Sequence, residues 1–231
     1  MKFSNYDFHP KVKQGIEELG FRKPTDIQYK AIPSILKGED ILAIAQTGTG
    51  KTGAFAIPII DTIMSVDFSF GVKVIVMAPT HELALQITNV FNAIGKYTTV
   101  RALALIGGVD QAPQIKALEN GVDIVVATPG RLFDMVSQMH LKLRNVEMLV
   151  LDEADLMLDL GFNNDITHLI DKLPTKRQTL FFSATINEKI KNLAYSIVNN
   201  PIRIQISPKD PVSKNISHSV MKVEMDDKRY F

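Results

Sequence analysis

The stretch Ile41-Leu-Ala-Ile-Ala-Gln-Thr-Gly-Thr-Gly-Lys-Thr52 decides the fold. Its first five residues are apolar throughout, which is typical of a strand buried on both faces. Gly48 and Gly50 then allow a tight loop whose backbone N–H groups can surround phosphate oxygens, and a helix beginning at Lys51 would add positive dipole. We therefore predict a phosphate site comprising Ala45, Gln46, Thr47, Gly48, Thr49, Gly50, Lys51 and Thr52. Ala45 stands where this pattern usually has a first glycine, and the alternative is a glycine-rich turn that binds nothing.

Short apolar segments alternate with longer helical segments on both sides of this stretch. The strand candidates are residues 41–45, 73–78, 102–106, 124–127, 148–151, 179–183 and 202–206. The helix candidates are residues 25–36, 51–65, 81–96, 111–120, 130–138, 164–171 and 187–198. This alternation predicts an α/β fold with a doubly wound, mostly parallel central sheet and helices on both faces. In such sheets the ligand lies beyond the carboxyl ends of the strands.

The composition excludes several classes of protein. The 231 residues contain no cysteine, which rules out disulfides, zinc–thiolate sites and iron–sulfur clusters. A total of 26 Lys and Arg against 25 Asp and Glu leaves a net charge of +1, so nucleic-acid binding must depend on local contacts. Residues 1–10 lack the apolar core of a signal peptide, and the longest apolar stretch, 54–60, is too short to span a bilayer. We expect a soluble cytoplasmic protein without membrane contact.

A pair of acidic residues follows another apolar strand candidate. Residues 148–151 run directly into Asp152 and Glu153. Two adjacent carboxylates at the end of a buried strand are costly unless a cation lies nearby. Beside a nucleoside triphosphate, Asp152 would hold Mg²⁺ and Glu153 would polarise the attacking water. The alternative is the acidic first turn of an ordinary helix.

Several further motifs resemble those of the DEAD-box ATP-dependent RNA helicases of superfamily two. They occur in family order between about residues 3 and 206. Asp152-Glu-Ala-Asp155 is the tetrapeptide that gives the family its name, and Ser183-Ala184-Thr185 matches motif III. Motif Ia is matched by Pro79-Thr80 with Glu82-Leu83-Ala84 and Gln86, and motif Ib by Gly107-Gly108 and Thr128-Pro-Gly-Arg131. The Q motif is matched by Gly20-Phe21, Pro24-Thr25 and Gln28.

The resemblance implies a RecA-like P-loop NTPase domain that uses ATP and Mg²⁺. The catalytic residues would be Lys51, Asp152 and Glu153, and the metal would be held by Thr52 and Asp152, partly through water. By the same resemblance, residues 1–30 form the Q-motif region, 31–208 the ATP-binding first helicase domain, and 209–231 a linker towards a second RecA-like domain that this sequence does not contain. We expect a loop at 207–211 and extended chain at 216–225.

Gln28 and Phe21 are the candidates for recognition of the base. A glutamine amide presents one donor and one acceptor, which match N7 and N6 of adenine, whereas guanine offers two acceptors there. Phe21 would stack on the base, and Phe3 would support Phe21. The alternatives are an ordinary exposed helical residue for Gln28 and a core aromatic for Phe21.

The remaining motifs are expected to bind RNA and to couple its binding to the nucleotide. Hydroxyls of Ser183 and Thr185 would hydrogen-bond to Asp155, although Thr185 or Asn187 could equally cap the following helix. Small hydroxyls, glycine amides and helix starts suit phosphate oxygens and carry no base code. The expected RNA contacts, to the sugar-phosphate backbone without sequence specificity, are Pro79, Thr80, His81, Gly108, Thr128 and Arg131. The expected coupling residues are Asp155, Ser183, Ala184 and Thr185.

Two residues depart from the family pattern. His81 stands where motif Ia usually has arginine, and Leu156 also replaces a common arginine. An arginine grips phosphate at any pH, whereas a histidine is mostly neutral at pH 7, so we expect a weaker and pH-dependent contact at His81. Two other functions stay open from the sequence: a non-catalytic module that binds a protein or RNA, and another P-loop motor such as a DNA translocase.

Overall fold

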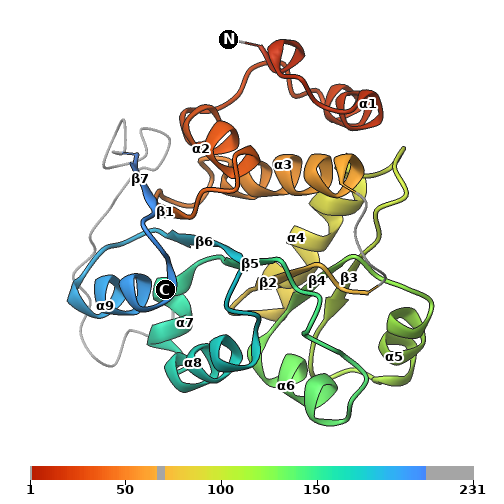
Figure 1. The fold of residues 1–231 in the computed structure, drawn as a ribbon, viewed down its shortest axis with the longest axis vertical. Helices are drawn as coiled ribbons and strands as arrows, with labels where there is room; N and C mark the ends of the chain where they lie inside the picture. Colours follow the sequence, from red (N-terminus) through yellow and green to blue (C-terminus); the bar gives the residue numbers. More distant parts are fainter. Residues whose placement is uncertain (1, 67–70, 207–231) are drawn as a thin grey trace, which may run out of the picture.

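The fold is built on one seven-stranded sheet in the order β3-β4-β2-β5-β6-β1-β7 (Figure 1). The structure is a computed structural model that describes residues 2–66 and 71–206. Each pair of neighbouring strands is parallel, which confirms the predicted sheet. The strands are β1 (Ile41–Ile44), β2 (Val74–Met77), β3 (Ala102–Leu105), β4 (Ile124–Ala127), β5 (Met148–Leu151), β6 (Gln178–Ser183) and β7 (Ile202–Gln205).

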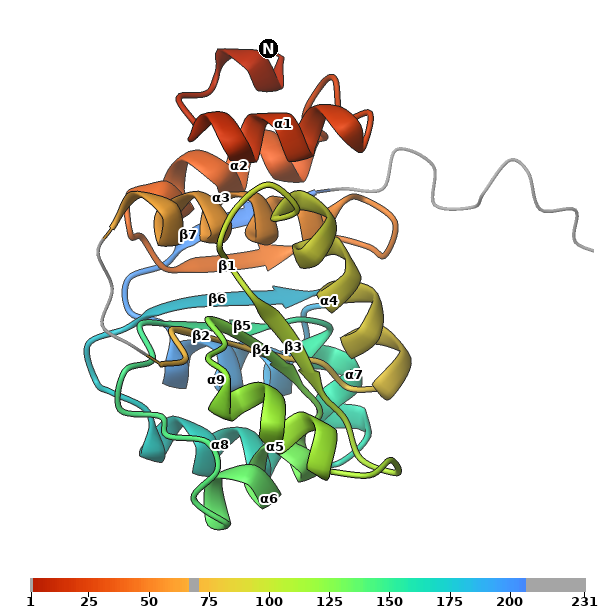
Figure 2. The same ribbon diagram turned by 90° about the vertical axis from the view of Figure 1, so that its right-hand side faces the viewer.

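Helices cover both faces of the sheet, as expected (Figure 2). One face carries α1 (Pro10–Glu18), α2 (Asp26–Leu36), α3 (Lys51–Ser65) and α4 (His81–Ile94), preceded by the short 3-10 helix η1 (Phe3–Asn5). The other face carries α5 (Ala112–Glu119), α6 (Pro129–Ser137), α7 (Ala154–Asp159), α8 (Asn163–Lys172) and α9 (Glu188–Ile197).

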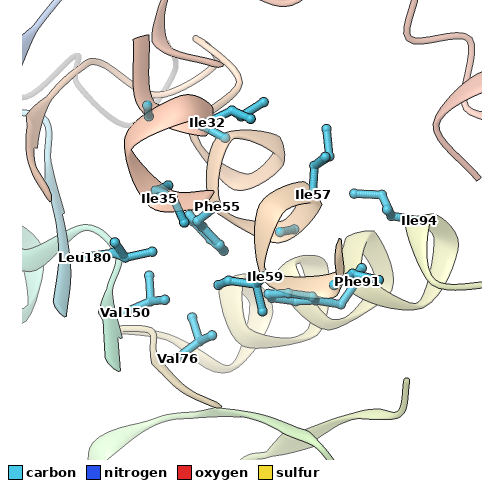
Figure 3. Close-up of a cluster of buried hydrophobic side chains, with 14 of the residues drawn as sticks. Ile32, Ile35, Phe55, Ile57, Ile59, Val76, Phe91, Ile94, Val150 and Leu180 are labelled. Carbon is cyan, nitrogen blue, oxygen red and sulfur yellow. The ribbon is translucent and has the colours of Figure 1, made fainter. Parts of the chain in front are cut away.

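The two helical layers enclose two separate hydrophobic clusters. On β1, Ile41 and Ala43 join the cluster beneath α2, α3 and α4, whereas Leu42 and Ile44 join the cluster on the opposite face. In the first cluster Phe55 of α3 packs against Phe91, with ring centroids 6.0 Å apart (Figure 3). Phe55 also packs against Phe182, with ring centroids 5.3 Å apart. Because successive side chains of a strand point to opposite faces, a strand buried on both must be apolar throughout.

The predicted elements are present, with ends that differ by no more than two residues. Among the described residues, the α-helices α1 and α7 and the 3-10 helix η1 were not predicted. α7 has only six residues and begins inside the acidic motif, so it shows little periodicity. α1 has a polar composition with Gly15 at its centre. Gly15 permits close packing onto α4, because a Cβ at this position would lie 2.1 Å from the carbonyl oxygen of Ile94.

The predicted loop at 207–211, the linker at 209–231 and the extended segment at 216–225 lie outside the described residues. Among residues 2–66 and 71–206, no helix is both long enough and apolar enough to cross a membrane.

Candidate functional site

The loop between β1 and α3 has the geometry of an anion-binding loop. Gly48 and Gly50 adopt φ angles of 78° and 91°, in the left-handed region that glycine tolerates best. The Thr49 hydroxyl donates a hydrogen bond of 2.7 Å to the carbonyl of Gln46 and closes the loop. Gly50 is the N-cap of α3, so the loop meets the positive end of the helix dipole. Ala45 is buried, Gln46, Thr47 and Gly48 are exposed, and Thr52 is half-buried in the first turn of α3.

The acidic pair lies within contact of this loop. Asp152 and Glu153 follow β5, which is separated from β1 in the sheet only by β6. The Lys51 ammonium group lies 2.7 Å from the Glu153 carboxylate, and the two side chains are only 5% and 12% exposed. Glu153 has φ 53° and ψ 49°, a left-handed conformation that is uncommon for a residue with a side chain. The fold therefore joins two motifs that lie 102 positions apart.

Asp152 is the most deeply buried acid of the site, at 2% exposure. Burial raises the pKa of Asp152 to about 7, with a smaller contribution from the negative charge of Glu153, while Lys51 opposes the rise. The backbone N–H of Glu153 donates to the Asp152 carboxylate at 3.1 Å. A carboxylate held in this way gains strongly from a nearby cation, because the cation compensates the lost solvation.

Gln28 packs against the phosphate loop and is not an exposed helical residue. Its side chain is buried, and its amide nitrogen donates to the carbonyl of Gly50 at 3.1 Å. Its amide oxygen accepts from the backbone N–H of Thr25 and forms the capping box of α2. Each amide atom keeps one further bonding position, so recognition of adenine by Gln28 stays a prediction.

The aromatic residues at the N-terminus lie beside the loop as expected. The rings of Phe3 and Phe21 are stacked, with centroids 6.2 Å apart and planes inclined by 27°. A Cβ at Gly53 of α3 would lie 3.7 Å from the Phe21 ring and 2.7 Å from the Gln28 amide nitrogen. Phe21 is half-buried.

The coupling candidates form a different hydrogen-bond pattern from the expected one. The Thr185 hydroxyl and backbone N–H both donate to one oxygen of Asp155, at 3.0 and 2.9 Å. The hydroxyl of Ser183 donates instead to the carbonyl of Thr185, because Ser183 is fully buried as the last residue of β6. Ala184 links these two residues. Helix α9 is capped by Asn187, whose side chain accepts from the N–H of Ile190.

Partial burial would raise the pKa of Asp155, but hydrogen bonds outweigh this effect and lower it. The Thr185 hydroxyl makes the largest of these hydrogen-bond contributions. The charged form of Asp155 is therefore favoured in the fold.

The expected RNA contacts gather at the carboxyl ends of β2, β3 and β4. The Thr80 hydroxyl accepts from the N–H of Leu83, so Thr80 is the N-cap of α4, and His81 is exposed beside it. A Cβ on Gly107 or Gly108 would lie 3.5 or 3.7 Å from the His81 ring, which brings motifs Ia and Ib together. Pro79, which precedes Thr80, is buried and is therefore less available to RNA than the sequence suggested.

Two residues of the Thr128-Pro-Gly-Arg131 motif are less available than the sequence suggested. Thr128 is only 6% exposed. The guanidinium of Arg131 donates to the carbonyl of Val109 at 2.8 Å, and its Nε and Nη1 atoms are buried. Arg131 therefore supports the neighbouring Gly107-Gly108 loop.

Gln114 contacts the same loop and was missed from the sequence. It lies on the helix predicted at 111–120, where a glutamine is usually solvated, yet it is 7% exposed. Both atoms of its amide bond the backbone of Ile106. No local sequence pattern predicts this contact, since Ile106 lies outside the helix that carries Gln114.

The nucleotide candidates and the RNA candidates follow different strands along the same edge of the sheet. The nucleotide motifs follow β1, β5 and β6, whereas the RNA motifs follow β2, β3 and β4. In the sheet these strands form two adjoining blocks that meet between β2 and β5. A nucleotide and an RNA strand could thus occupy neighbouring halves of one edge.

Comparisons with known proteins agree with this geometry. The family model for the DEAD/DEAH box helicase matches residues 25–193. The chain is similar to the DEAD-box ATP-dependent RNA helicase CshB of Listeria monocytogenes, with 40% identity over 95% of this chain and 51% of that protein. It is 39% identical to the ATP-dependent RNA helicase RhlB of Shewanella oneidensis over 98% of this chain and 53% of that one.

A solved structure extends the similarity to three dimensions. A DEAD box protein from the hyperthermophile Methanococcus jannaschii superposes with a TM-score of 0.83 at 37% identity, covering 89% of this chain and 56% of that one. The chain spans about half the length of CshB and RhlB. The sheet is that of the RecA-like domain of this family, and the chain belongs to the DEAD/DEAH box helicases.

Proposed function

We propose that the chain is the ATP-binding first domain of an ATP-dependent RNA helicase. The observation that carries the proposal is the contact between Lys51 of the phosphate loop and Glu153 of the acidic motif, which are 2.7 Å apart and largely buried. A phosphate loop alone is compatible with many functions. A lysine and two carboxylates at one edge of the sheet suit phosphoryl transfer to water.

Lys51 would neutralise the β- and γ-phosphates, and Glu153 would orient the attacking water and accept its proton. Thr52 and Asp152 would hold Mg²⁺, which supplies charge neutralisation on the phosphate oxygens. The donor set fits this ion: a hydroxyl and one or two carboxylates are hard oxygen ligands. Among residues 2–66 and 71–206, no group of three His, Asp or Glu residues could hold a metal alone. Mg²⁺ is bound in proteins largely through one or two carboxylates, substrate phosphates and water.

Selection of ATP would depend on Gln28 and on Phe21. The hydrogen bond from Gln28 to Gly50 supports this role, because it places the side-chain amide of Gln28 directly against the phosphate loop. Binding of adenine would use the second N–H of the amide nitrogen and the second lone pair of the oxygen.

RNA would cross the half of the edge formed by β2, β3 and β4. Thr80, His81 and Gly108 are the exposed residues that we expect to contact its phosphates. Asp155 and Thr185 would transmit RNA binding to the nucleotide site, since they lie two residues after Glu153 and two residues after the end of β6. A second RecA-like domain would close over both sites and add positive charge to the transition state.

The isolated chain should therefore bind nucleotide but hydrolyse ATP slowly, if at all. Arg131, which follows β4 at this edge, already donates to the carbonyl of Val109, and Arg101 precedes β3 at the opposite edge of the sheet. A steady-state ATPase rate similar to that of two-domain relatives would contradict this expectation.

The decisive experiment is thermal unfolding with Mg²⁺ and saturating ADP or GDP. A ligand at about 100 times its Kd stabilises a protein by about 2.7 kcal/mol. For a domain of this size we expect a rise in Tm of roughly 5–11 °C with ADP and a smaller one with GDP. Lys51→Met should abolish the rise, whereas Lys116→Met, an exposed lysine on α5, should retain it. Equal rises would reject base selection by Gln28, and no rise would favour a non-catalytic module.

The RNA assignment needs its own test. Single-stranded RNA and DNA of the same sequence should compete unequally for the chain, in favour of RNA, because 2′-hydroxyl contacts distinguish them. Equal competition would favour a DNA translocase. In the longer protein, His81→Arg should tighten RNA binding at pH 8 more than at pH 6, and equal affinities at both pH values would reject the role of His81.

A further inference from the structure

We propose that Gln114 is a positioning residue for RNA binding, which holds the loop at 106–111 in the shape that presents Gly108. The inference rests on the proposed RNA-binding function and adds to it a residue outside the family motifs described above. The loop joins β3 to α5 and contains the Gly107-Gly108 pair. Its path is set by contacts from three helices.

Gln114 makes the central contact. Its amide oxygen accepts from the backbone N–H of Ile106 at 3.2 Å, and its amide nitrogen donates to the carbonyl of Ile106 at 3.2 Å. The side chain thus satisfies both backbone groups of one residue, as a neighbouring strand would. Gln114 is buried at 7% exposure, so this pair of bonds is shielded from water.

The position of β3 in the sheet explains why this contact matters. β3 is the edge strand, paired on one side with β4. The carbonyl of Leu105 accepts from the N–H of Thr128, on the side of β4. Because backbone groups of successive strand residues point to opposite sides, those of Ile106 face the open edge. Gln114 covers that edge at the point where the strand turns into the loop.

Other contacts secure the rest of the loop. Arg131 of α6 donates to the carbonyl of Val109 at 2.8 Å. The Asp110 carboxylate accepts from the N–H of Ala112 at 3.0 Å and begins α5. The ring of His81 from α4 lies against Gly107 and Gly108. The loop is therefore held at its start, at its end and on one side.

Gly108 is the residue that this arrangement presents. It is exposed and adopts a φ of 70°. An unrestrained glycine samples this conformation as only one of many. A loop with two adjacent glycines loses much conformational freedom when it orders on a ligand. Because Gln114 already orders the loop in the absence of RNA, less conformational entropy is lost when RNA binds. Pre-organisation of this kind increases affinity without a direct contact between Gln114 and RNA.

The proposal is tested by Gln114→Met, which keeps the approximate volume and removes both hydrogen bonds. Binding of fluorescein-labelled oligouridylate to the 231-residue chain would be measured by anisotropy at low salt, beside binding of ADP. We expect RNA affinity to fall about five- to tenfold and ADP affinity to stay within about twofold, because the loop lies in the other half of the sheet edge. Amide hydrogen exchange at Ile106–Asp110 should quicken in the variant.

Two further variants complete the test. Gln114→Glu keeps the bond from the Ile106 N–H but loses the donor to its carbonyl, so it should weaken RNA binding as well. Gln114→Glu also replaces Gln114→Met as the test variant if the latter does not fold. Gln138→Met changes an exposed glutamine at the C-cap of α6, and should leave both ligands unaffected.

Unchanged RNA binding despite faster exchange in the loop would overturn the role of Gln114. An equal loss of RNA and ADP affinity would also overturn it, since the residue would then act on the stability of the whole domain. If the unmodified chain bound no RNA, the proposed RNA-binding function itself would fail, and that result is distinct from either outcome.

Discussion

The ammonium group of Lys51 and the carboxylate of Glu153 form a buried ion pair, with 2.7 Å between Nζ and Oε1. The lysine expected to bind phosphate is therefore already paired with the carboxylate expected to polarise water. In the proposed site a nucleotide would compete with Glu153 for Lys51, and its phosphates would also be repelled by the same carboxylate. Both effects would oppose nucleotide binding.

Glu153→Gln should accordingly tighten binding of Mg²⁺-ADP, by about fivefold if the competing bond is worth about 1 kcal/mol. The measurement is a titration with a fluorescent ADP analogue. Glu119→Gln removes the same charge from an exposed position on α5 and should leave the Kd unchanged. Weaker or equal binding by Glu153→Gln would contradict competition between the ion pair and the nucleotide.

Asp152 should make stability depend on pH in the absence of nucleotide. Its pKa is raised to about 7 in the fold, from an ordinary value of 3.8. A carboxyl with a raised pKa binds its proton more tightly in the folded state, so stability is greatest below pH 4 and decreases as pH rises to about 7. Asp152→Asn should remove this decrease and stabilise the domain at pH 8, by on the order of 2–4 kcal/mol.

Urea unfolding of both proteins between pH 4 and pH 8 would measure this difference. The difference in the free energy of unfolding between Asp152→Asn and the unmodified chain should be small near pH 4 and constant above pH 7. A gap that does not change with pH would show that Asp152 does not titrate in this range.

The hydrogen bond between Thr185 and Asp155 should stabilise the domain at neutral pH. The pKa of Asp155 is lowered, so its contribution is present above pH 3.8 and is lost as pH falls below that value. Thr185→Val should cost about 1 kcal/mol at pH 7, and this cost should shrink as pH falls below 3.8 and through the lowered pKa of Asp155, because the protonated carboxyl no longer needs the donor. Thr185→Ser keeps the hydroxyl and serves as the control. Chemical unfolding of the three proteins over a series of pH values from 7 downwards measures the cost, and a cost that stays constant through acid would contradict the prediction.

Gly15→Ala should destabilise the domain, because the new Cβ would lie 2.1 Å from the carbonyl oxygen of Ile94. Relief of this clash requires α1 to move away from α4, and overpacking of this kind costs about 1–3 kcal/mol. Gly130→Ala is a matched control, since a Cβ there meets nothing within 4 Å. In a helix that change should be neutral or stabilising by about 0.5–1 kcal/mol. Equal Tm values for the two variants would refute tight packing of α1.

The fold class could be predicted from the sequence because its signals are local. Strands β1 to β5 are apolar runs of four residues, β6 has an apolar centre, and each predicted helix shows its own periodicity. α1 escaped prediction because Gly15 weakens its helical pattern, and only contact with Ile94 makes the glycine favourable. α7 escaped because six residues show less than two turns of periodicity.

The candidate site could be predicted only as a set of motifs. The glycines at 48 and 50 indicated a phosphate loop by themselves, since positive φ angles and a following helix are local properties. The partners of the polar side chains could not be predicted in the same way. Gln28 bonds Gly50, Ser183 bonds Thr185 rather than Asp155, and Arg131 bonds Val109.

The sequence by itself determined the alternation of strands and helices, the phosphate loop and the family motifs, because each depends on residues that are neighbours in the chain. Only the tertiary structure decided that Lys51 meets Glu153, that Gln114 closes the edge of β3, and that the motifs separate into two halves of one sheet edge. The physical reason is the strand order. Parallel strands are joined by crossover connections, so strands that are adjacent in the sheet, such as β1 and β6, can be far apart in the chain, and no local pattern reports which strands pair.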